Sequence, residues 1–148
     1  MINKKYMRVI FDTNIFVSYL LTKEDKNTIV SLVENIFAGK FKLLITEDLL
    51  EELRKKITHK RYLAKMIKIG DLKDVLMSLH EIGEQIPKIT GKFPSFTRDP
   101  KDDYLIVYAL VGQADYLVTG DKDLLILKKI DQVKIVLPRQ FLKIIKHF

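Results

Sequence analysis

Four acidic side chains fall at points in the sequence where a strand or a helix is expected to end or begin. They are Asp12, Glu52, Asp102 and Asp121. Carboxylates that converge repel one another and raise one another's pKa, unless a divalent cation supplies the compensating charge. Mg²⁺ or Mn²⁺, as one or two ions, is the cation that hard oxygen ligands of this kind prefer. If the four side chains meet in the folded chain, they form a metal site.

Each of these acids, taken alone, also has a purely structural explanation. Asp12 and Asp121 are expected in turns, where Asp accepts hydrogen bonds from nearby backbone amides. Asp102 would complement the dipole at the start of a helix, and Glu52 would be solvated on a helix surface. The metal-site prediction therefore depends on the four residues as a set.

Other catalytic chemistries have little support in the sequence. The chain has no cysteine, which excludes thiolate nucleophiles, disulfides and cysteine-based zinc or iron–sulfur sites. None of its histidines, His59, His80 and His147, lies in an acidic motif, so histidine acid–base catalysis is unsupported. Water activation by a metal ion is the remaining route, in which one ion lowers the pKa of the attacking water and a second would stabilise the leaving oxygen.

The charge balance favours a polyanionic partner. With 26 Lys and Arg against 19 Asp and Glu the net charge is +7, and setting the four acids aside leaves 26 minus 15, or +11. Residues 54–70 contain seven basic residues and no acidic one, and Tyr62 among them is available for base stacking. A solvated helix face explains this basic segment equally well. The residues that would guide phosphates to the metal are Arg54, Lys55, Lys60 and Arg61.

The hydrophobic pattern divides the chain into alternating strands and helices. Short runs rich in β-branched and aromatic residues predict strands at 8–12, 41–45, 85–89, 116–119 and 134–137. Apolar residues spaced three and four apart predict helices at 15–21, 28–37, 47–57, 62–69, 72–82, 100–112 and 124–127, with a last helix from 138. The alternation is typical of an α/β fold, a three-layer α/β/α sandwich with a central, mainly parallel sheet. One such domain accounts for residues 1–148.

Local signals place the acids relative to these elements. Thr46 and Asp99 are expected N-caps, and Pro100 fits the first position of the helix that follows Asp99. Asp12 and Asp121 fall at the carboxyl ends of strands. In open parallel sheets, ligand sites gather beyond these ends, at the point where the strand order reverses.

Four motifs along the chain combine the acids with a characteristic setting. They are Phe11-Asp12-Thr13-Asn14, which contains Asp-x-Asn, the acidic helix at 46–53, the segment from Asp99-Pro100-Lys101-Asp102-Asp103 to Ala109, and 114–125 with its Val-Thr-Gly-Asp stretch. Together they span nearly the whole chain. In this combination the sequence resembles the PIN domain, the nuclease domain of VapC-type toxins.

The resemblance implies roles for particular side chains. Its metal-binding and catalytic quartet would consist of Asp12, Glu52, Asp102 and Asp121. Its supporting polar residues would be Asn14, Thr119, Asp103 and Asp123. Two assignments stay open, because Glu51 could share or take the role of Glu52, and Asp103 that of Asp102. Asp99, like Asp123, would lie outside the direct ligands.

The resemblance also implies an activity and a setting for it. The chain would be a Mg²⁺- or Mn²⁺-dependent endoribonuclease that hydrolyses RNA phosphodiester bonds without a covalent intermediate. It would be the toxin of a VapBC-type pair, with a cognate antitoxin protein as a partner and with a homodimer as its assembly. A cytoplasmic location is expected, and no membrane partner is, because no apolar run approaches the roughly 20 residues needed to cross a bilayer.

Two alternatives belong to other functional classes. A non-catalytic RNA-binding or interaction module would keep the basic surface and use the acids only as caps. A haloacid-dehalogenase-like phosphatase also begins with a strand that ends in Asp, but it needs Asp-x-Asp, and Asn14 stands where its second carboxylate would act as general acid.

Overall fold

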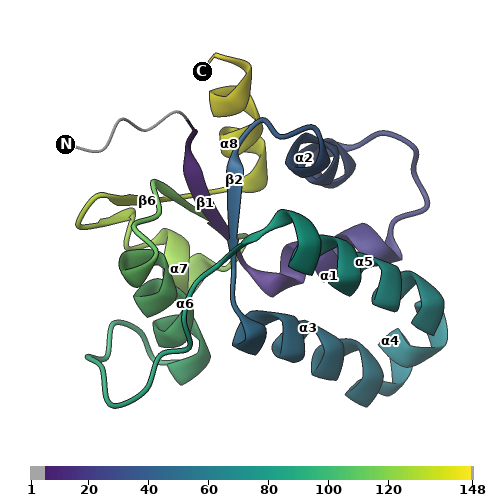
Figure 1. The fold of residues 1–148 in the computed structure, drawn as a ribbon, viewed down its shortest axis with the longest axis horizontal. Helices are drawn as coiled ribbons and strands as arrows, with labels where there is room; N and C mark the ends of the chain where they lie inside the picture. Colours follow the sequence, from purple (N-terminus) through teal and green to yellow (C-terminus); the bar gives the residue numbers. More distant parts are fainter. Residues whose placement is uncertain (1–5, 148) are drawn as a thin grey trace.

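The computed structural model describes residues 6–147 and contains a six-stranded sheet with helices on both faces (Figure 1). The strands are β1 (Arg8–Phe11), β2 (Lys42–Ile45), β3 (Glu84–Gln85), β4 (Tyr116–Val118), β5 (Lys129–Ile130) and β6 (Val133–Val136). The helices are α1 (Thr13–Leu21), α2 (Thr28–Phe37), α3 (Glu47–His59), α4 (Arg61–Met66), α5 (Ile69–Ile82), α6 (Pro100–Val111), α7 (Lys122–Leu125) and α8 (Pro138–Lys146). The predicted α/β class is confirmed.

The strand order is β3-β2-β1-β4-β6-β5, and all neighbouring pairs are parallel except β5 with β6. The chain builds one half of the sheet outward from β1 and then returns to add β4 on the other side of β1. The order therefore reverses between β1 and β4. Because Phe11 pairs with Val118, the residues that follow these strands, Asp12 and Thr119, emerge side by side.

The sheet separates two hydrophobic clusters, which gives the predicted three layers. Val9 and Phe11 of β1 face a cluster with α1, α2, α3, α4, α5 and α8. Ile10, between them, faces the cluster with α6 and α7, as expected for side chains that alternate across a strand. Figure 1 shows α6 and α7 on one side of β1 and β2, and α1, α3 and α5 on the other.

Aromatic packing fixes the end of β1, where the first acidic motif begins. Phe11 is buried, and its ring lies 5.8 Å from those of Phe16 and Phe41 and 6.2 Å from that of Phe141. A ring held on several sides has little freedom to move. The residue after it, Asp12, is thereby carried on a rigid support.

Several predicted boundaries differ from the structure; for example, the helix predicted at 62–69 spans Arg61–Met66. The strand predicted at 85–89 is only β3, because its neighbour β2 ends at Ile45 and α3 begins at Glu47, so no strand continues beside the residues after Ile86. The helix predicted at 72–82 begins at Ile69, since Gly70 and Asp71 are tolerated in a first turn.

The other differences lie near the C-terminus. The helix predicted at 124–127 is shifted to Lys122–Leu125, because Asp121 caps it. Strand β5 was not predicted, since two residues are too few for a periodic pattern. It is formed by a hairpin whose turn residue Asp131 adopts a φ of 51°, a conformation that Asp accepts more readily than most residues.

Within residues 6–147, no helix is both long enough and apolar enough to span a lipid bilayer.

Candidate metal centre

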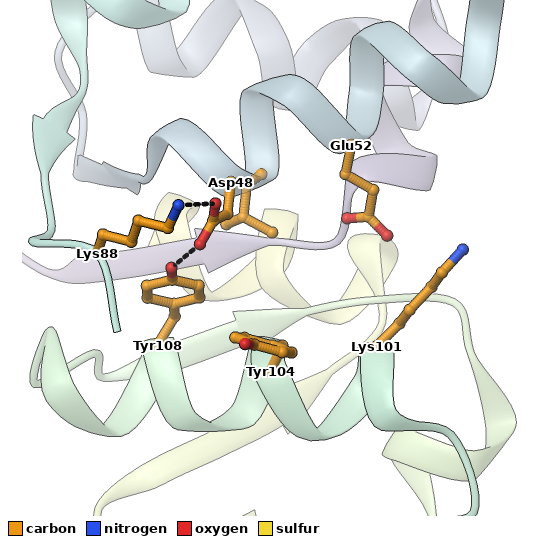
Figure 2. A pocket seen from close by; sticks show the side chains of 7 residues that line it. Asp48, Glu52, Lys88, Lys101, Tyr104 and Tyr108 are labelled. Atoms are coloured by element: carbon orange, nitrogen blue, oxygen red, sulfur yellow. Dashed lines mark hydrogen bonds and ion pairs between the residues drawn. The ribbon is translucent and has the colours of Figure 1, made fainter. Parts of the chain in front are cut away.

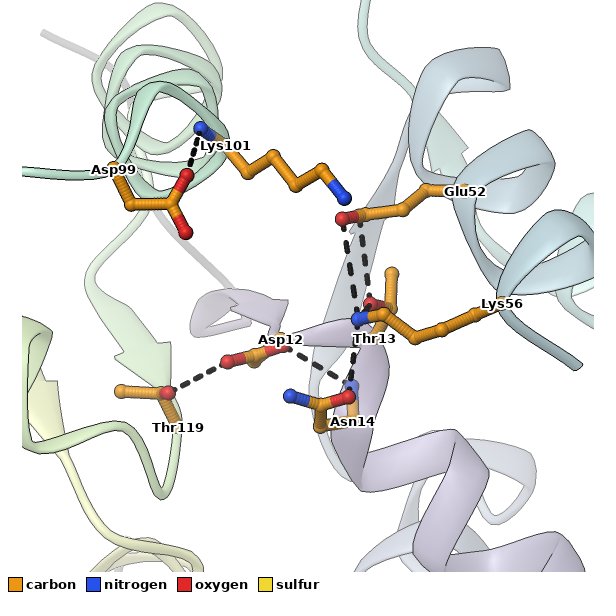
Figure 3. A network of polar contacts seen from close by, with 8 residues as sticks. All are labelled: Asp12, Thr13, Asn14, Glu52, Lys56, Asp99, Lys101 and Thr119. Atoms are coloured by element: carbon orange, nitrogen blue, oxygen red, sulfur yellow. Dashed lines mark hydrogen bonds and ion pairs between the residues drawn. The ribbon is translucent and has the colours of Figure 1, made fainter. Parts of the chain in front are cut away.

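Asp12 lies at the point where the strand order reverses. Its backbone N–H donates to the Val118 carbonyl at 2.9 Å, so the residue is held to β4 as well as to β1. Its Oδ1 accepts the Asn14 amide at 3.1 Å, and its Oδ2 accepts the Thr119 hydroxyl at 2.8 Å (Figure 3). The residue is only 8% exposed. Asp12 therefore both caps α1 and presents a fixed carboxylate at the sheet edge.

Asp121 follows β4 and caps the short helix α7. Its backbone N–H donates to the Thr119 hydroxyl at 3.0 Å, and its Oδ1 accepts the amide of Asp123 at 2.9 Å. Thr119 thus contacts both Asp12 and Asp121 through one hydroxyl group. This shared contact sets the relative positions of the two carboxylates.

Asp102 lies in the first turn of α6 and faces the same edge. Burial raises its pKa to about 7, and the nearby charges of Asp121, Asp99 and Asp12 act in the same direction. The charges that raise it, those of Asp121, Asp99 and Asp12, are all negative. The sequence argument that a nearby acid raises the pKa of another therefore applies to Asp102.

One group of acids in the described chain has the spacing needed to hold a cation. Asp102, Asp121 and Asp123 can each place one carboxylate oxygen so that the three lie within 4.8 Å of one another. We call these three residues the carboxylate cluster. Asp123 also accepts two hydrogen bonds at 3.1 Å from the guanidinium of Arg98. Asp123, expected only to support the site, is thus part of this arrangement, whereas Asp12 lies beside it.

Glu52 lies outside the carboxylate cluster but at the same edge of the sheet. It is on α3, where its carboxylate accepts the Thr13 hydroxyl at 3.4 Å and lies 3.9 Å from the Lys56 ammonium group. Lys56 also donates to Thr13 at 2.9 Å and to the Asn14 side chain at 3.0 Å. Figure 3 shows Lys101 reaching from the start of α6 toward Glu52. Glu52 is therefore tied to the end of α1 that carries Asp12.

The structure distinguishes Asp103 from Asp102. Asp103 is 4% exposed and turns to the loop before α6, where it accepts the Phe96 and Thr97 amides at 2.9 and 2.8 Å and the hydroxyls of Thr97 and Ser95. Burial alone would raise its pKa, but these hydrogen bonds leave the pKa below its usual value. Asp103 holds the loop and does not face the carboxylate cluster.

Glu51 and Glu52 are distinguished in the same way. Glu51 is exposed on α3, and its carboxylate accepts two hydrogen bonds from Arg54, at 2.9 and 2.5 Å. The hydrogen bond from Arg54 lowers the pKa of Glu51. Glu51 is thus paired on the helix surface, while Glu52 faces Thr13. Asp99 is also accounted for locally, because it caps α6 by accepting the Lys101 amide at 2.9 Å.

The basic residues predicted to contact RNA do not all lie together. A cavity of about 500 Å³ runs along α3 beside Glu52. Lys55 and Lys60 line it, whereas Arg54 is paired with Glu51 and Arg61 lies outside the lining. Lys56, one of the seven basic residues of 54–70, lines it too, and so does Lys101, which the sequence argument did not single out as basic. We call this cavity the basic groove; its lining residues are Asp48, Glu51, Glu52, Lys55, Lys56, His59, Lys60 and Lys101.

A second cavity adjoins the basic groove, and the sequence argument missed it. It measures about 380 Å³ and lies between α3 and α6 (Figure 2). We call it the tyrosine pocket; it is lined by Asp48, Leu49, Glu52, Lys88, Lys101, Tyr104 and Tyr108. A signal was present in the sequence, because Lys101, Tyr104 and Tyr108 are spaced three and four apart and so share one helix face.

The donor set suits Mg²⁺ or Mn²⁺. All the candidate ligands at this edge are carboxylate oxygens, and no histidine belongs to the cluster in the part of the chain that the structure describes. Hard divalent cations take oxygen ligands, and a cation here would remove the repulsion that raises the pKa of Asp102. Such a site, flanked by lysines, can bind a phosphate group and polarise it.

A comparison with protein families gives one match. The model of the family described as the PIN domain matches residues 8–123, a range that contains Asp12, Glu52 and the three residues of the carboxylate cluster. No curated protein matches the chain significantly.

Proposed function

The chain belongs to the PIN domain family, whose members are usually metal-dependent nucleases, and from this premise we propose that it is a Mg²⁺- or Mn²⁺-dependent ribonuclease that cuts phosphodiester bonds within RNA. The observation that carries the proposal is the convergence of acids at the β1 and β4 ends. Asp102 there has a pKa of about 7 because of burial and of the charges of Asp121, Asp99 and Asp12. A bound metal ion would relieve the repulsion between Asp102 and the acids around it, which supports a metal site here.

The chain's own residues would divide the work at this site. Asp12, Asp102 and Asp121 would bind the ion, and Glu52 would complete the site directly or through water. The Thr119 hydroxyl and the Asn14 amide hold the two oxygens of Asp12, so its carboxylate cannot rotate away. Bound Mg²⁺ or Mn²⁺ supplies a Lewis acid and a water of lowered pKa.

The surroundings of the acids favour a phosphodiester substrate. Lys55, Lys56 and Lys60 line the basic groove beside Glu52, and the chain as a whole carries +7. Positive charge along a groove attracts a nucleic-acid backbone and raises the rate of encounter. RNA, as the specific nucleic acid, is our proposal and comes from the family resemblance.

The test is cleavage of labelled single-stranded RNA by purified protein, with Mn²⁺ or with EDTA. We expect cleavage with Mn²⁺ only, and we expect Asp102→Asn to abolish it. The matched control is Asp131→Asn, which removes a carboxylate from the β5–β6 turn, before the start of β6 and so at the other edge of the sheet. Equal cutting by the wild type and by Asp102→Asn would refute the proposed site.

The cleavage assay and a measurement of intact mass together test the alternative functions. A non-catalytic RNA-binding module would bind the labelled RNA but leave it intact with every divalent ion. A haloacid-dehalogenase-like phosphatase would transfer the phosphoryl group of a small substrate to Asp12 and release the alcohol, and the resulting aspartyl phosphate is detected by intact-mass measurement as an added phosphate. A metal-dependent ribonuclease forms no such adduct.

The biological setting is a proposal that rests on the resemblance to VapC-type toxins. We expect the chain to be the toxin of a toxin–antitoxin pair, to bind a cognate antitoxin protein and to form a homodimer. Induced expression in bacterial cells should then arrest growth, and expression of Asp102→Asn at the same level should not. Light scattering of the purified chain gives the assembly state directly.

A further inference from the structure

We propose that the tyrosine pocket is a base-binding subsite for the RNA substrate, in which a guanine stacks on Tyr104 and is read by Asp48 and Lys88. The inference rests on the proposed function, since it identifies the nucleotide that would lie beside the catalytic carboxylates. The pocket's volume of about 380 Å³ falls within the range of small-ligand sites, roughly 300–1,000 Å³.

The walls of the pocket suit a flat aromatic group. Tyr104 is 39% exposed, and Figure 2 shows its ring nearly edge-on, with one face turned toward α3. The ring of Phe93 meets it in a T-shaped contact at 4.6 Å, which holds the orientation of the Tyr104 ring. Leu49 lines the pocket from α3. A base inserted here would lie between an aromatic face and an aliphatic side chain.

The end of the pocket carries a specific arrangement of polar groups. Asp48 accepts a hydrogen bond from the Tyr108 hydroxyl, and its other carboxylate oxygen lies 3.9 Å from the Lys88 ammonium group. Because the Tyr108 oxygen also accepts the Ile89 amide at 3.4 Å, its own proton is directed at Asp48. The side chains of Asp48 and Lys88 are 38% and 68% exposed, so a ligand can reach both.

This pair offers acceptors and a donor side by side, which matches one base best. The Watson–Crick edge of guanine presents an acceptor, O6, next to two donors, N1–H and the N2 amino group. Lys88 can donate to O6 while the Asp48 carboxylate accepts from N1–H and N2–H. Uracil has a single donor between two acceptors, and cytosine places two acceptors where Asp48 would repel them.

The pocket is placed to deliver this nucleotide to the metal centre. Asp48 and Glu52 are four residues apart on α3, so they lie on one helix face about 6 Å apart along its axis. Glu52 and Lys101 line both the tyrosine pocket and the basic groove. A base held at the Asp48 end therefore directs its phosphate toward Glu52 and Lys101.

The test is binding, measured apart from cleavage. Fluorescence anisotropy in EDTA would follow labelled heptamers of uridine, in which the central residue is guanosine, adenosine, cytidine or uridine. We expect the wild type to bind the guanosine heptamer about tenfold more tightly than the uridine one. Asp48→Asn should remove this preference while it keeps an acceptor for Tyr108.

Two variants of the ring test the stacking contact. Tyr104→Leu should weaken binding of every heptamer about tenfold, and Tyr104→Phe, which keeps the aromatic face, should bind like the wild type. The control is Phe37→Leu, which removes an exposed ring at the end of α2, before β2 begins and so at the opposite edge of the sheet. Melting curves would establish that each variant is folded.

The outcomes separate the subsite from the proposed activity. Equal binding of the four heptamers by the wild type, no measurable binding, or an unaffected Tyr104→Leu would overturn the subsite even if the protein cleaves RNA. A guanosine preference that depends on Asp48 and Tyr104 supports the subsite even if no cleavage is detected, because the measurement contains no metal.

Discussion

Asp102 and Asp103 carry the same carboxyl group on neighbouring residues of α6, and they face two different regions of the molecule. Asp102 belongs to the carboxylate cluster, where burial and the charges of other acids raise its pKa to about 7. Asp103 faces the 95–97 loop, where two amides and two hydroxyls donate to it and lower its pKa despite its burial. One carboxylate has its charge stabilised by the protein, and the other does not.

The difference shows how a site for an external cation is recognised. A buried charge that serves the fold is surrounded by donors from the same chain. A charge that serves a ligand is left in an unfavourable environment, which the ligand then relieves. On this criterion Asp103 stabilises the fold, and Asp102 is the residue that we propose for the metal site.

The largest expected effect is on cleavage. Asp102→Asn should lower the rate of Mn²⁺-dependent RNA cleavage at least about 100-fold, because it removes a carboxylate that we propose to bind the metal, and even outer partners of a metal site commonly contribute 10–100-fold. Asp103→Asn should retain most of the wild-type rate, since its side chain faces the loop. Rates from single-turnover assays on both variants would check this. Similar losses of cleavage rate in the two variants would contradict the different roles that we assign to Asp102 and Asp103.

The same two positions should have opposite effects on stability: substitution of Asp103 should destabilise the protein, and substitution of Asp102 should not. Asp103→Ala leaves the Phe96 and Thr97 amides without their acceptor, so it should lower the free energy of unfolding by about 3 kcal/mol. Asp103→Asn keeps one acceptor oxygen and should lower it less. Urea denaturation at pH 7 measures both values. An unchanged midpoint for Asp103→Ala would show that the loop does not depend on this carboxylate.

Asp102→Asn should stabilise the metal-free protein. At pH 8 the Asp102 carboxylate is ionised against its surroundings, and its removal should raise the free energy of unfolding by about 1 kcal/mol, after allowance for solvent screening. Millimolar Mn²⁺ should then raise the melting temperature of the wild type more than that of the variant, because a ligand of the native state stabilises it. Scanning calorimetry with EDTA and with Mn²⁺ compares the two proteins.

Asp102 and Asp103 should also make the stability of the protein depend on pH in opposite ways. The folded pKa of Asp102, about 7, lies above its unfolded value, so the folded state binds an extra proton between about pH 4 and 7. The contribution of the Asp102 carboxyl group to the free energy of unfolding is therefore full below about pH 4 and is lost as the pH rises to 7. Asp103 has a lowered pKa, so its contribution is present above about pH 4 and is lost at lower pH. Denaturation of the metal-free wild type and of each Asn variant between pH 3 and 8 would reveal both trends.

The smallest effect is expected at a carboxylate far from both regions. Glu84 forms an ion pair with Arg8, and the hydrogen bond from Arg8 lowers its pKa. Glu84→Gln should lower stability at pH 7 by no more than about 0.5 kcal/mol, because solvent screens a partly exposed pair. RNA cleavage should be unaffected. A larger loss would contradict this expectation, and it would show that the ion pair with Arg8 contributes to stability even though the side chain of Glu84 is partly exposed.

The sequence by itself determined the fold class and much of the edge where the acids meet. Parallel strands with a reversal of order bring their carboxyl ends together, so Asp12 and Asp121 could be placed before the fold was known. The caps at Thr46 and Asp99 were also predicted, because a cap depends only on residues three or fewer positions away. These features follow from local patterns that survive in any arrangement of the helices.

Only the tertiary structure decided which of two adjacent acids faces the site. Neighbouring residues on a helix point about 100° apart, so the choice between Asp102 and Asp103 depends on how α6 is rotated against the sheet and on where the 95–97 loop lies. In the same way, the orientation of α3 decided that Glu52 faces Thr13 while Glu51 pairs with Arg54 on the helix surface. The tyrosine pocket was missed because its walls come from two helices about 50 residues apart in sequence. Contacts between distant segments depend on the packing of whole elements, which no short pattern records.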